Sequence, residues 1–192
     1  MAVYQGMNGL PVASVRPAGL LDDPSERLAA AFDAHHERLF RLARRLTSNR
    51  DDALDLVQET FLRAARSPGS IPVGPTGEEA WLVRILINIR RDQWRRTVVR
   101  ERHDPEMKPS SWSNGNQEDA VIARTTVWRA LDALAPRRRA VVVMHELEGL
   151  TPPAIASLLG ISAVTVRWHL SMGRRDLTRL VTSQKREGHE DC

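Results

Sequence analysis

Several residue types are scarce in this sequence of 192 residues, and each scarcity excludes a class of structure. Cys192 is the only cysteine, so one chain can form neither a disulfide framework nor a cysteine-based zinc site. Lys108 and Lys185 are the only lysines among 28 basic residues, and the formal net charge is +4. Arginine carries a planar fork of donors that suits phosphates and guanine edges, so this composition favours a polyanionic partner.

Long apolar runs and alternating strand patterns are also missing. The apolar stretch at residues 83–89 is interrupted by Arg84 and Asn88 and is much shorter than a membrane span. The N-terminus lacks the charged start and apolar centre of a signal peptide. We therefore expect a cytoplasmic protein. Because no strand-like alternation of useful length occurs, we also expect an all-α fold.

Helical periodicity divides the chain into two small helical domains. Residues 1–22 are rich in Gly, Pro and small residues and are expected to form a mobile N-terminal extension. Asp23-Pro24 supplies an N-cap and a first-turn proline, and helical patterns follow over residues 23–101, with a Pro/Gly-rich loop at 67–77. Residues 102–119 have the composition of a flexible linker. Helical patterns resume over 120–182, and 183–192 form a polar tail.

The sharpest local motif is TPPAIASLLGISAVTVR at residues 151–167. Thr151 can cap a first helix, Gly160 permits a left-handed turn, and Ser162 can cap a second helix. This spacing is typical of a helix-turn-helix, whose second helix presents donors to the major groove. The predicted DNA contacts on the outward stripe of that helix are Arg167, Trp168, Ser171 and Arg174. An ordinary helix pair with solvated arginines is the alternative. Nine arginines against four acidic residues over 121–182 favour DNA binding.

The segment DDALDLVQETFLRAAR at residues 51–66 combines an apolar stripe with an outward acidic and polar surface flanked by leucines. Such a surface is suited to docking on another protein. The predicted docking residues are Leu54, Asp55, Gln58 and Glu59. A metal or nucleotidyl-transfer site is the alternative interpretation of the acids. The helix macrodipole favours acids at a helix start in any case, and neither a partner histidine nor a second acidic motif supports catalysis.

The segment AWLVRILINIRRDQWRR at residues 80–96 carries a basic stripe beside its apolar face. The stripe consists of Arg84, Asn88, Arg91 and Arg95. Guanidinium groups can hold phosphates while flat side chains such as Trp94 stack on unpaired bases, so this helix suits a separated DNA strand. The alternative is a solvated basic face with Trp94 folded onto a neighbouring helix.

The order and spacing of these segments resemble the extracytoplasmic-function (ECF) group of sigma factors, which belong to the sigma-70 family of bacterial RNA polymerase initiation factors. The resemblance covers about residues 23–181. DALDLVQETFLRAAR resembles region 2.2, which docks on the polymerase clamp, and residues 80–96 resemble the helix that opens and binds the −10 element. LDALAPRRRAVVVMHELEGL with the helix-turn-helix resembles region 4, which binds the −35 element and contacts the polymerase flap.

The resemblance implies a sigma factor that has no catalytic activity, metal or cofactor, binds core RNA polymerase and promoter DNA, and is regulated by an anti-sigma factor. By this resemblance, the four docking residues on 51–66 would bind the polymerase. The basic stripe would bind the −10 element, and the outward stripe of the helix-turn-helix would bind the −35 element. The loop at 67–77 would hold a flipped base of the −10 element, and the linker would thread the RNA path of the polymerase.

Some positions depart from the family pattern, and other classes of protein share parts of it. Residues 151–154 lack the usual capping glutamate, Ala163-Val164 replaces a pair that normally ends in glycine, and Trp168 is bulky, which leaves the −35 sequence open. A response regulator would share the helix-turn-helix but would need a receiver or ligand domain, and the N-terminal half of the sequence has no α/β pattern. An enzyme would need to use the acidic cluster or His35-His36, and a protein that only sequesters another factor is a further alternative.

Overall fold

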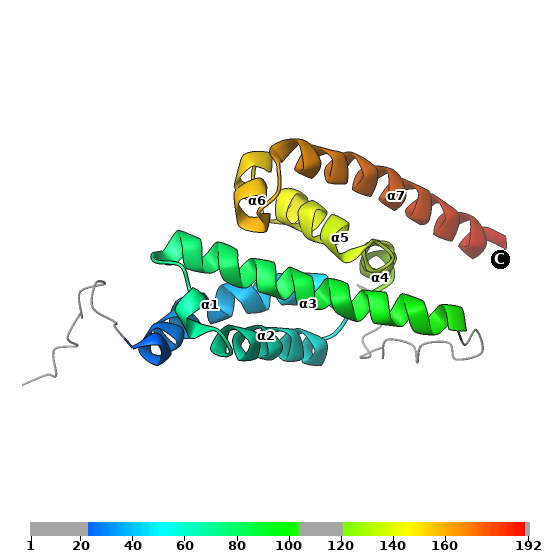
Figure 1. The fold of residues 1–192 in the computed structure, drawn as a ribbon. Helices are drawn as coiled ribbons and strands as arrows, with labels where there is room; N and C mark the ends of the chain where they lie inside the picture. Colours follow the sequence, from blue (N-terminus) through cyan, green and yellow to red (C-terminus); the bar gives the residue numbers. More distant parts are fainter. Residues whose placement is uncertain (1–22, 104–120, 191–192) are drawn as a thin grey trace, which may run out of the picture.

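The computed structural model describes residues 23–103 and 121–190, which fold as helices in two small domains (Figure 1). The first domain contains α1 (Pro24–Leu46), α2 (Arg50–Ala65), the 3-10 turn η1 (Pro68–Ser70) and α3 (Pro75–His103). The second contains α4 (Val121–Asp132), α5 (Pro136–Val142), the π-turn η2 (Val143–Leu147), α6 (Pro152–Leu159) and α7 (Ala163–Glu190). The predicted extension at 1–22, most of the linker at 102–119 and the last two residues lie outside the described part of the chain.

Local capping determines where the helices of the first domain begin. The Asp23 carboxylate accepts a hydrogen bond of 2.9 Å from the Ser25 amide, and Pro24 occupies the first turn of α1. Asn49 caps α2 in the same way through the Asp52 amide, at 2.7 Å. Gly74 has a φ of +93°, which lets the chain turn into α3 at Pro75, inside the predicted loop at 67–77.

The turn of the helix-turn-helix also follows the sequence prediction. Thr151 Oγ1 accepts from the Ala154 amide at 3.4 Å, and Ser162 Oγ accepts from the Thr165 amide at 3.0 Å. Gly160 is left-handed, with φ +64° and ψ 40°, at the C-cap of α6. α7 is longer than the sequence pattern indicated. Residues 183–190, expected to be a polar tail, continue this helix as far as Glu190.

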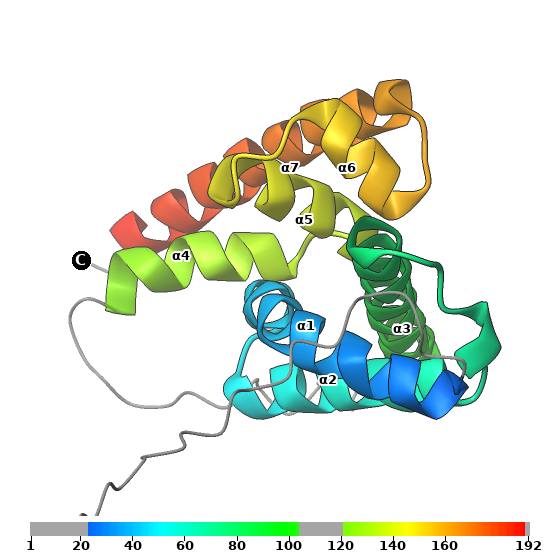
Figure 2. The ribbon, with the colours of Figure 1, turned by 90° about the vertical axis from the view of Figure 1, so that its left-hand side faces the viewer.

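The second domain lies against the first on one side of α3 (Figures 1 and 2). α5 and α6 contact α3, and α5 also contacts α1, whereas α2 packs against α1 and α3. Buried residues of both domains, from Leu39 and Leu86 to Val141 and Ile155, form one continuous hydrophobic core. The sequence pattern indicated a single buried face on α3. In the structure Val83 and Ile87 are also buried, so α3 is covered on two sides.

Arginines from two helices satisfy the carbonyls at the end of α1. Nε of Arg90, on α3, donates to the Leu46 carbonyl at 3.1 Å. Nε of Arg139, on α5, donates to the Arg45 carbonyl at 3.0 Å, and its guanidinium also pairs with Asp132. The last carbonyls of a helix lack partners within the helix and attract cations. Arg139 therefore connects the second domain to the end of α1.

The π-turn η2 shifts the pattern of buried residues that follows it. Its wider hydrogen bond joins the Glu148 amide to the Val143 carbonyl at 3.3 Å. Val143 is fully buried, but Leu147, four residues later, is 50% exposed. The Glu148 side chain is instead 7% exposed and lies against α1. The extra residue of the turn therefore directs Glu148 inward.

Candidate functional site

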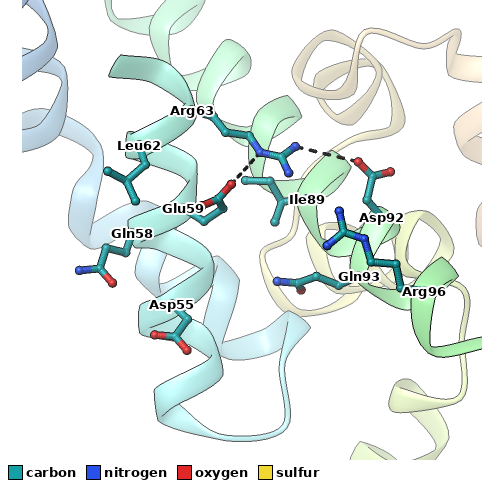
Figure 3. A pocket seen from close by; sticks show the side chains of 9 residues that line it. All are labelled: Asp55, Gln58, Glu59, Leu62, Arg63, Ile89, Asp92, Gln93 and Arg96. Atoms are coloured by element: carbon teal, nitrogen blue, oxygen red, sulfur yellow. Dashed lines mark hydrogen bonds and ion pairs between the residues drawn. The ribbon is translucent and has the colours of Figure 1, made fainter. Parts of the chain in front are cut away.

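A polar groove runs between α2 and α3 (Figure 3). α2 lies on the side of α3 away from the second domain (Figure 1). The volume of the groove is about 440 Å³. The lining residues are Asp55, Gln58, Glu59, Leu62 and Arg63 from α2, and Ile89, Asp92, Gln93 and Arg96 from α3. Glu59 accepts from Nε of Arg63 at 3.0 Å, and Nη1 of Arg63 lies 3.9 Å from Asp92. The two walls of the groove are thus joined by a chain of charges.

Three of the four predicted docking residues come together in this groove. Asp55, Gln58 and Glu59 face it, while Leu54 is exposed on α2 outside the lining. Leu62 adds an exposed apolar side chain that is 54% accessible. Sequence reasoning did not find the wall contributed by α3. The only available signal was the spacing of Asp92 and Arg96 by one helical turn, which is common on any solvated helix.

The loop between α2 and α3 is held against α1 and exposes its tip. Nη2 of Arg27, on α1, donates to the Pro72 carbonyl at 3.4 Å, and Nε2 of His35 lies 3.3 Å from the Glu78 carboxylate at the start of α3. Val73 is 93% exposed between these anchors. The loop predicted to hold a flipped base is therefore a supported projection of the first domain.

The predicted −10 residues differ in how accessible they are. Arg95 is exposed, whereas Arg84, Asn88 and Arg91 are half-buried. Nε of Arg84 donates to the Ala80 carbonyl at 3.0 Å. A Cβ placed on Gly160 would lie 3.1 Å from Nη1 of Arg84, so this arginine lies against the C-terminus of α6. Nε of Arg91 is buried and has no hydrogen-bond partner among the described residues.

The predicted −35 residues all lie on the outer surface of α7. Arg167, Trp168, Ser171 and Arg174 are exposed, and Arg174 pairs with Glu146 at 2.7 Å. Arg138, on α5, pairs with Asp176 and places its guanidinium carbon 5.8 Å from the centre of the Trp168 ring. The Trp168 side chain is therefore oriented by a cation–π contact from a second helix.

His169 lies beside these residues in a basic environment. Burial lowers its pKa, and the charges of Arg138 and Arg137 lower it further. Its buried Nδ1 has no hydrogen-bond partner within the described part of the chain. The neutral imidazole is therefore the favoured form near neutral pH.

The side chains of the adjacent histidines His35 and His36 contact different parts of the first domain. His35 is buried and pairs with Glu78, whereas the ring of His36 lies 4.8 Å from that of Phe32. Within residues 23–103 and 121–190, no group of three or more His, Cys, Asp or Glu side chains could hold a metal ion.

In the same part of the chain, no single helix is long and apolar enough to cross a membrane. Only α6 and α7, joined across a bend of 108°, reach that length and composition together.

Comparison with known proteins identifies both domains. The family model Sigma-70 region 2 matches residues 31–99, and the model Sigma-70, region 4 matches residues 124–177. ECF RNA polymerase sigma factor SigL of Mycobacterium tuberculosis is 32% identical over 166 residues, which cover 84% of this chain and 93% of that protein. ECF RNA polymerase sigma factor SigE of Mycolicibacterium smegmatis is 37% identical over 151 residues, which cover 74% of this chain but 57% of that protein.

Solved structures share the fold at lower sequence identity. The sigma factor RpoE of Bartonella quintana, solved in complex with the anti-sigma factor NepR, superposes with a TM-score of 0.57 at 23% identity and covers 82% of this chain and 96% of its own. CnrH, solved in complex with the cytosolic domain of CnrY, gives a TM-score of 0.55 at 24% identity and covers 83% of this chain and 90% of its own.

The chain therefore belongs to the sigma-70 family, in its ECF group. Proteins of this class are transcription initiation factors and not enzymes, as the resemblance implied. The response-regulator hypothesis is wrong, because helices of sigma region 2 stand where a receiver domain would be needed.

Proposed function

We propose that this sigma factor binds core RNA polymerase through the groove between α2 and α3 and directs it to promoters by means of α3 and α7. The observation that carries this proposal is the groove itself. Exposed Leu62 beside Asp55, Gln58 and Glu59 combines apolar area with charge in a concave surface. Such a surface suits a polar, well-packed protein partner more than a small apolar ligand.

In this proposal the two DNA-binding surfaces have different tasks. Arg167 and Trp168 at the start of α7 would contact base edges of the −35 element, and Arg174 would contact phosphates. Arg84, Asn88, Arg91 and Arg95 on α3 would hold the separated non-template strand of the −10 element, with the loop around Val73 receiving a flipped base. In this proposal, residues 23–101 form the domain that binds polymerase and the −10 element, and residues 120–182 form the domain that binds the −35 element. The protein would act in the cytoplasm.

Reconstitution with core polymerase and mapping of transcript starts tests the proposal. Arg167→Ala should lower initiation from duplex promoters about tenfold, because a bidentate base contact contributes about 1–3 kcal/mol. Arg179→Ala is a matched control, since Arg179 is also exposed on α7 but lies twelve residues further along the helix. The absence of any promoter-specific start with the wild-type protein would refute the proposal.

Docking can be measured separately from initiation. Replacing Asp55 and Glu59 together with alanine should weaken binding to core polymerase while the helical circular dichroism stays unchanged. Arg167→Ala should leave the same affinity intact. Unchanged polymerase affinity in the Asp55/Glu59 variant would mean that another surface of the protein makes the contact.

Regulation by an anti-sigma factor is also proposed. Its support is the fold shared with RpoE, which was solved with such a partner. A candidate anti-sigma protein should co-purify with the full chain and lower its affinity for core polymerase. Co-purification without any loss of polymerase binding would contradict this role.

A further inference from the structure

Arg138, on α5, holds two residues of α7, and the proposed function does not use this contact. Its guanidinium carbon lies 5.8 Å from the centre of the Trp168 ring, within the range of a cation–π attraction. The guanidinium also pairs with Asp176, and its buried Nε has no hydrogen-bond partner among the described residues. The Trp168 ring and the Asp176 carboxylate therefore set the position of the guanidinium.

Gly173 lets the Arg138 side chain run close to α7. A Cβ placed on Gly173 would lie 3.3 Å from Cγ and 3.7 Å from Cδ of Arg138, so the stem of the arginine lies directly against this glycine. Trp168 precedes Gly173 on α7 and Asp176 follows it. The Arg138 side chain thus meets α7 at Gly173 and contacts one residue on each side of it.

Two neighbours restrict the Trp168 ring, and about half of this residue remains exposed. Besides the contact from Arg138, the ring of His169 lies 4.9 Å away, centre to centre, with an angle of 67° between the two planes. Trp168 is 53% exposed and lies on the same outer surface as Arg167 and Ser171. A side chain that is already held in place loses little conformational entropy when a partner covers it. Trp168 is therefore preorganised for a contact outside the protein.

The chemistry of the indole ring narrows the choice of that contact. The ring is apolar except for Nε1–H, which can donate a hydrogen bond but cannot accept one. In the major groove, base pairs present hydrogen-bond donors and acceptors together with one apolar group, the C5-methyl of thymine. Because the Arg138 guanidinium occupies one face of the ring, the opposite face and the edge are left for an apolar contact. Trp168 therefore suits a thymine methyl better than any other group on the base edges.

We propose that Trp168 selects thymine in the −35 element by packing on its C5-methyl, and that Arg138 is the positioning residue that holds the indole for this contact. The inference rests on the proposed function, which places α7 against the base edges of the −35 element. It adds a base preference to that function, and it adds a residue of α5 to the four predicted on α7. Arg138 acts through Trp168 in this role.

The first experiment removes only the methyl group. Holoenzyme selects a promoter from duplexes randomised over the −35 element, and each thymine of the selected element is then replaced in turn by 2′-deoxyuridine, which keeps the base pair and the O4 acceptor. At one thymine, uracil should weaken wild-type binding about fourfold, equivalent to the ~0.8 kcal/mol of one buried methyl. Trp168→Ala should bind both duplexes equally at that position. A selected element without thymine, no uracil effect at any position, or the same effect in Trp168→Ala would overturn the proposal.

A second set of variants tests the role of Arg138. Arg138→Ala should lower the fourfold ratio at the same thymine to about twofold, because a cation–π contact is comparable in strength with the burial of one methyl. Arg138→Lys keeps a cation for the ring and should restore most of the ratio. Adding Arg138→Ala to Trp168→Ala should cause no further loss of discrimination.

Arg137→Ala is the matched control, because it removes the neighbouring arginine of α5. A phosphate contact carries no sequence information, so this variant can weaken both duplexes equally but should keep the ratio between them. An unchanged ratio in Arg138→Ala, or an equal fall in Arg137→Ala, would overturn the positioning role.

The contact itself can be tested in the free full-length chain. 5-Fluorotryptophan labels all five tryptophans for ¹⁹F NMR, and Trp168→Phe identifies the resonance of Trp168. Arg138→Ala should shift this resonance because the ring loses its cation, and Arg137→Ala should shift it less. A resonance that Arg138→Ala does not move would overturn the proposal. A wild-type holoenzyme that selects no −35 element would refute the proposed function, whereas a selected element without a uracil effect would refute only thymine selection by Trp168.

Discussion

Replacing Arg139 with methionine removes the charged contacts that α5 makes with the end of α1 while keeping an unbranched apolar stem. The wild-type guanidinium pairs with Asp132 and donates to the Arg45 carbonyl at 3.0 Å and the Thr47 carbonyl at 3.5 Å. Burial lowers the pKa of Arg139, and the nearby Asp132 carboxylate opposes this effect. The charged side chain is therefore stabilised mainly by its own partners.

The size of the effect follows from those partners. Breaking a buried ion pair by removing one member costs about 3–5 kcal/mol, because the other charge is left uncompensated. Asp132 is 28% exposed and can be hydrated once Arg139 is gone. We therefore expect Arg139→Met to lower the free energy of unfolding by about 3 kcal/mol, and Tm by about 6–12 °C for a protein of this size.

Urea denaturation followed by circular dichroism at 222 nm measures this loss. Arg129→Met, at an exposed arginine on α4, is the matched control and should stay within about 0.5 kcal/mol of wild type. Arg139→Lys should be intermediate, because an ammonium group retains the charge but lacks the planar fork. An Arg139→Met protein as stable as the control would refute the assignment of the α1–α5 contact to this side chain.

Three other predictions concern packing, pH and docking. Gly173→Ala should lower the free energy of unfolding by about 1–3 kcal/mol although alanine favours helices, because the added Cβ would lie 2.5 Å from Cγ2 of Val142. Adding Val142→Ala should relieve this clash. Thermal melts in which Gly173→Ala leaves Tm unchanged would contradict the prediction. Because the pKa of His169 is lowered in the folded protein, the unfolded chain binds a proton at this imidazole more readily, and the free energy of unfolding should fall as the pH drops below about 6.5. His169→Gln should make the free energy of unfolding, measured by urea titration, less dependent on pH in this range. An unchanged pH dependence would exclude His169 as its source. Leu62→Ser should weaken core polymerase binding in a fluorescence anisotropy titration without changing Tm, and equal affinity would remove Leu62 from the docking surface.

The caps and turns could be predicted from the sequence because each depends on residues close together in the chain. Asp23, Thr151 and Ser162 each cap a helix through an amide two or three residues ahead, and Gly160 needs only its own backbone conformation. The apolar stripes likewise gave the helices and the all-α fold. The order of the segments indicated the family, and the family models confirmed it.

Contacts between distant residues could not be predicted in this way. Glu148 pairs with Arg38, 110 positions earlier, and Arg139 donates to a carbonyl 94 positions earlier. In the sequence, 137–139 is a run of three arginines that could equally be a solvated basic patch. The structure buries Arg139 and directs Arg138 to Asp176 and Trp168. The basic stripe on α3 gave no indication that α6 covers Arg84, because periodicity identifies the faces of a helix but not its neighbours.

Because of the π-turn at Val143–Leu147, the contact between the domains depends on the number of residues in this turn as well as on their types. A π-turn holds one more residue than an α-turn, and removing that residue rotates everything that follows by about 100°. A relative one residue shorter at this turn would present a different side chain to α1 even if all its other residues were unchanged. An alignment that places such a gap in the loop at 148–151 would compare residues that face in different directions. Insertions and deletions within this helix are therefore a route by which evolution could change how firmly the two domains associate.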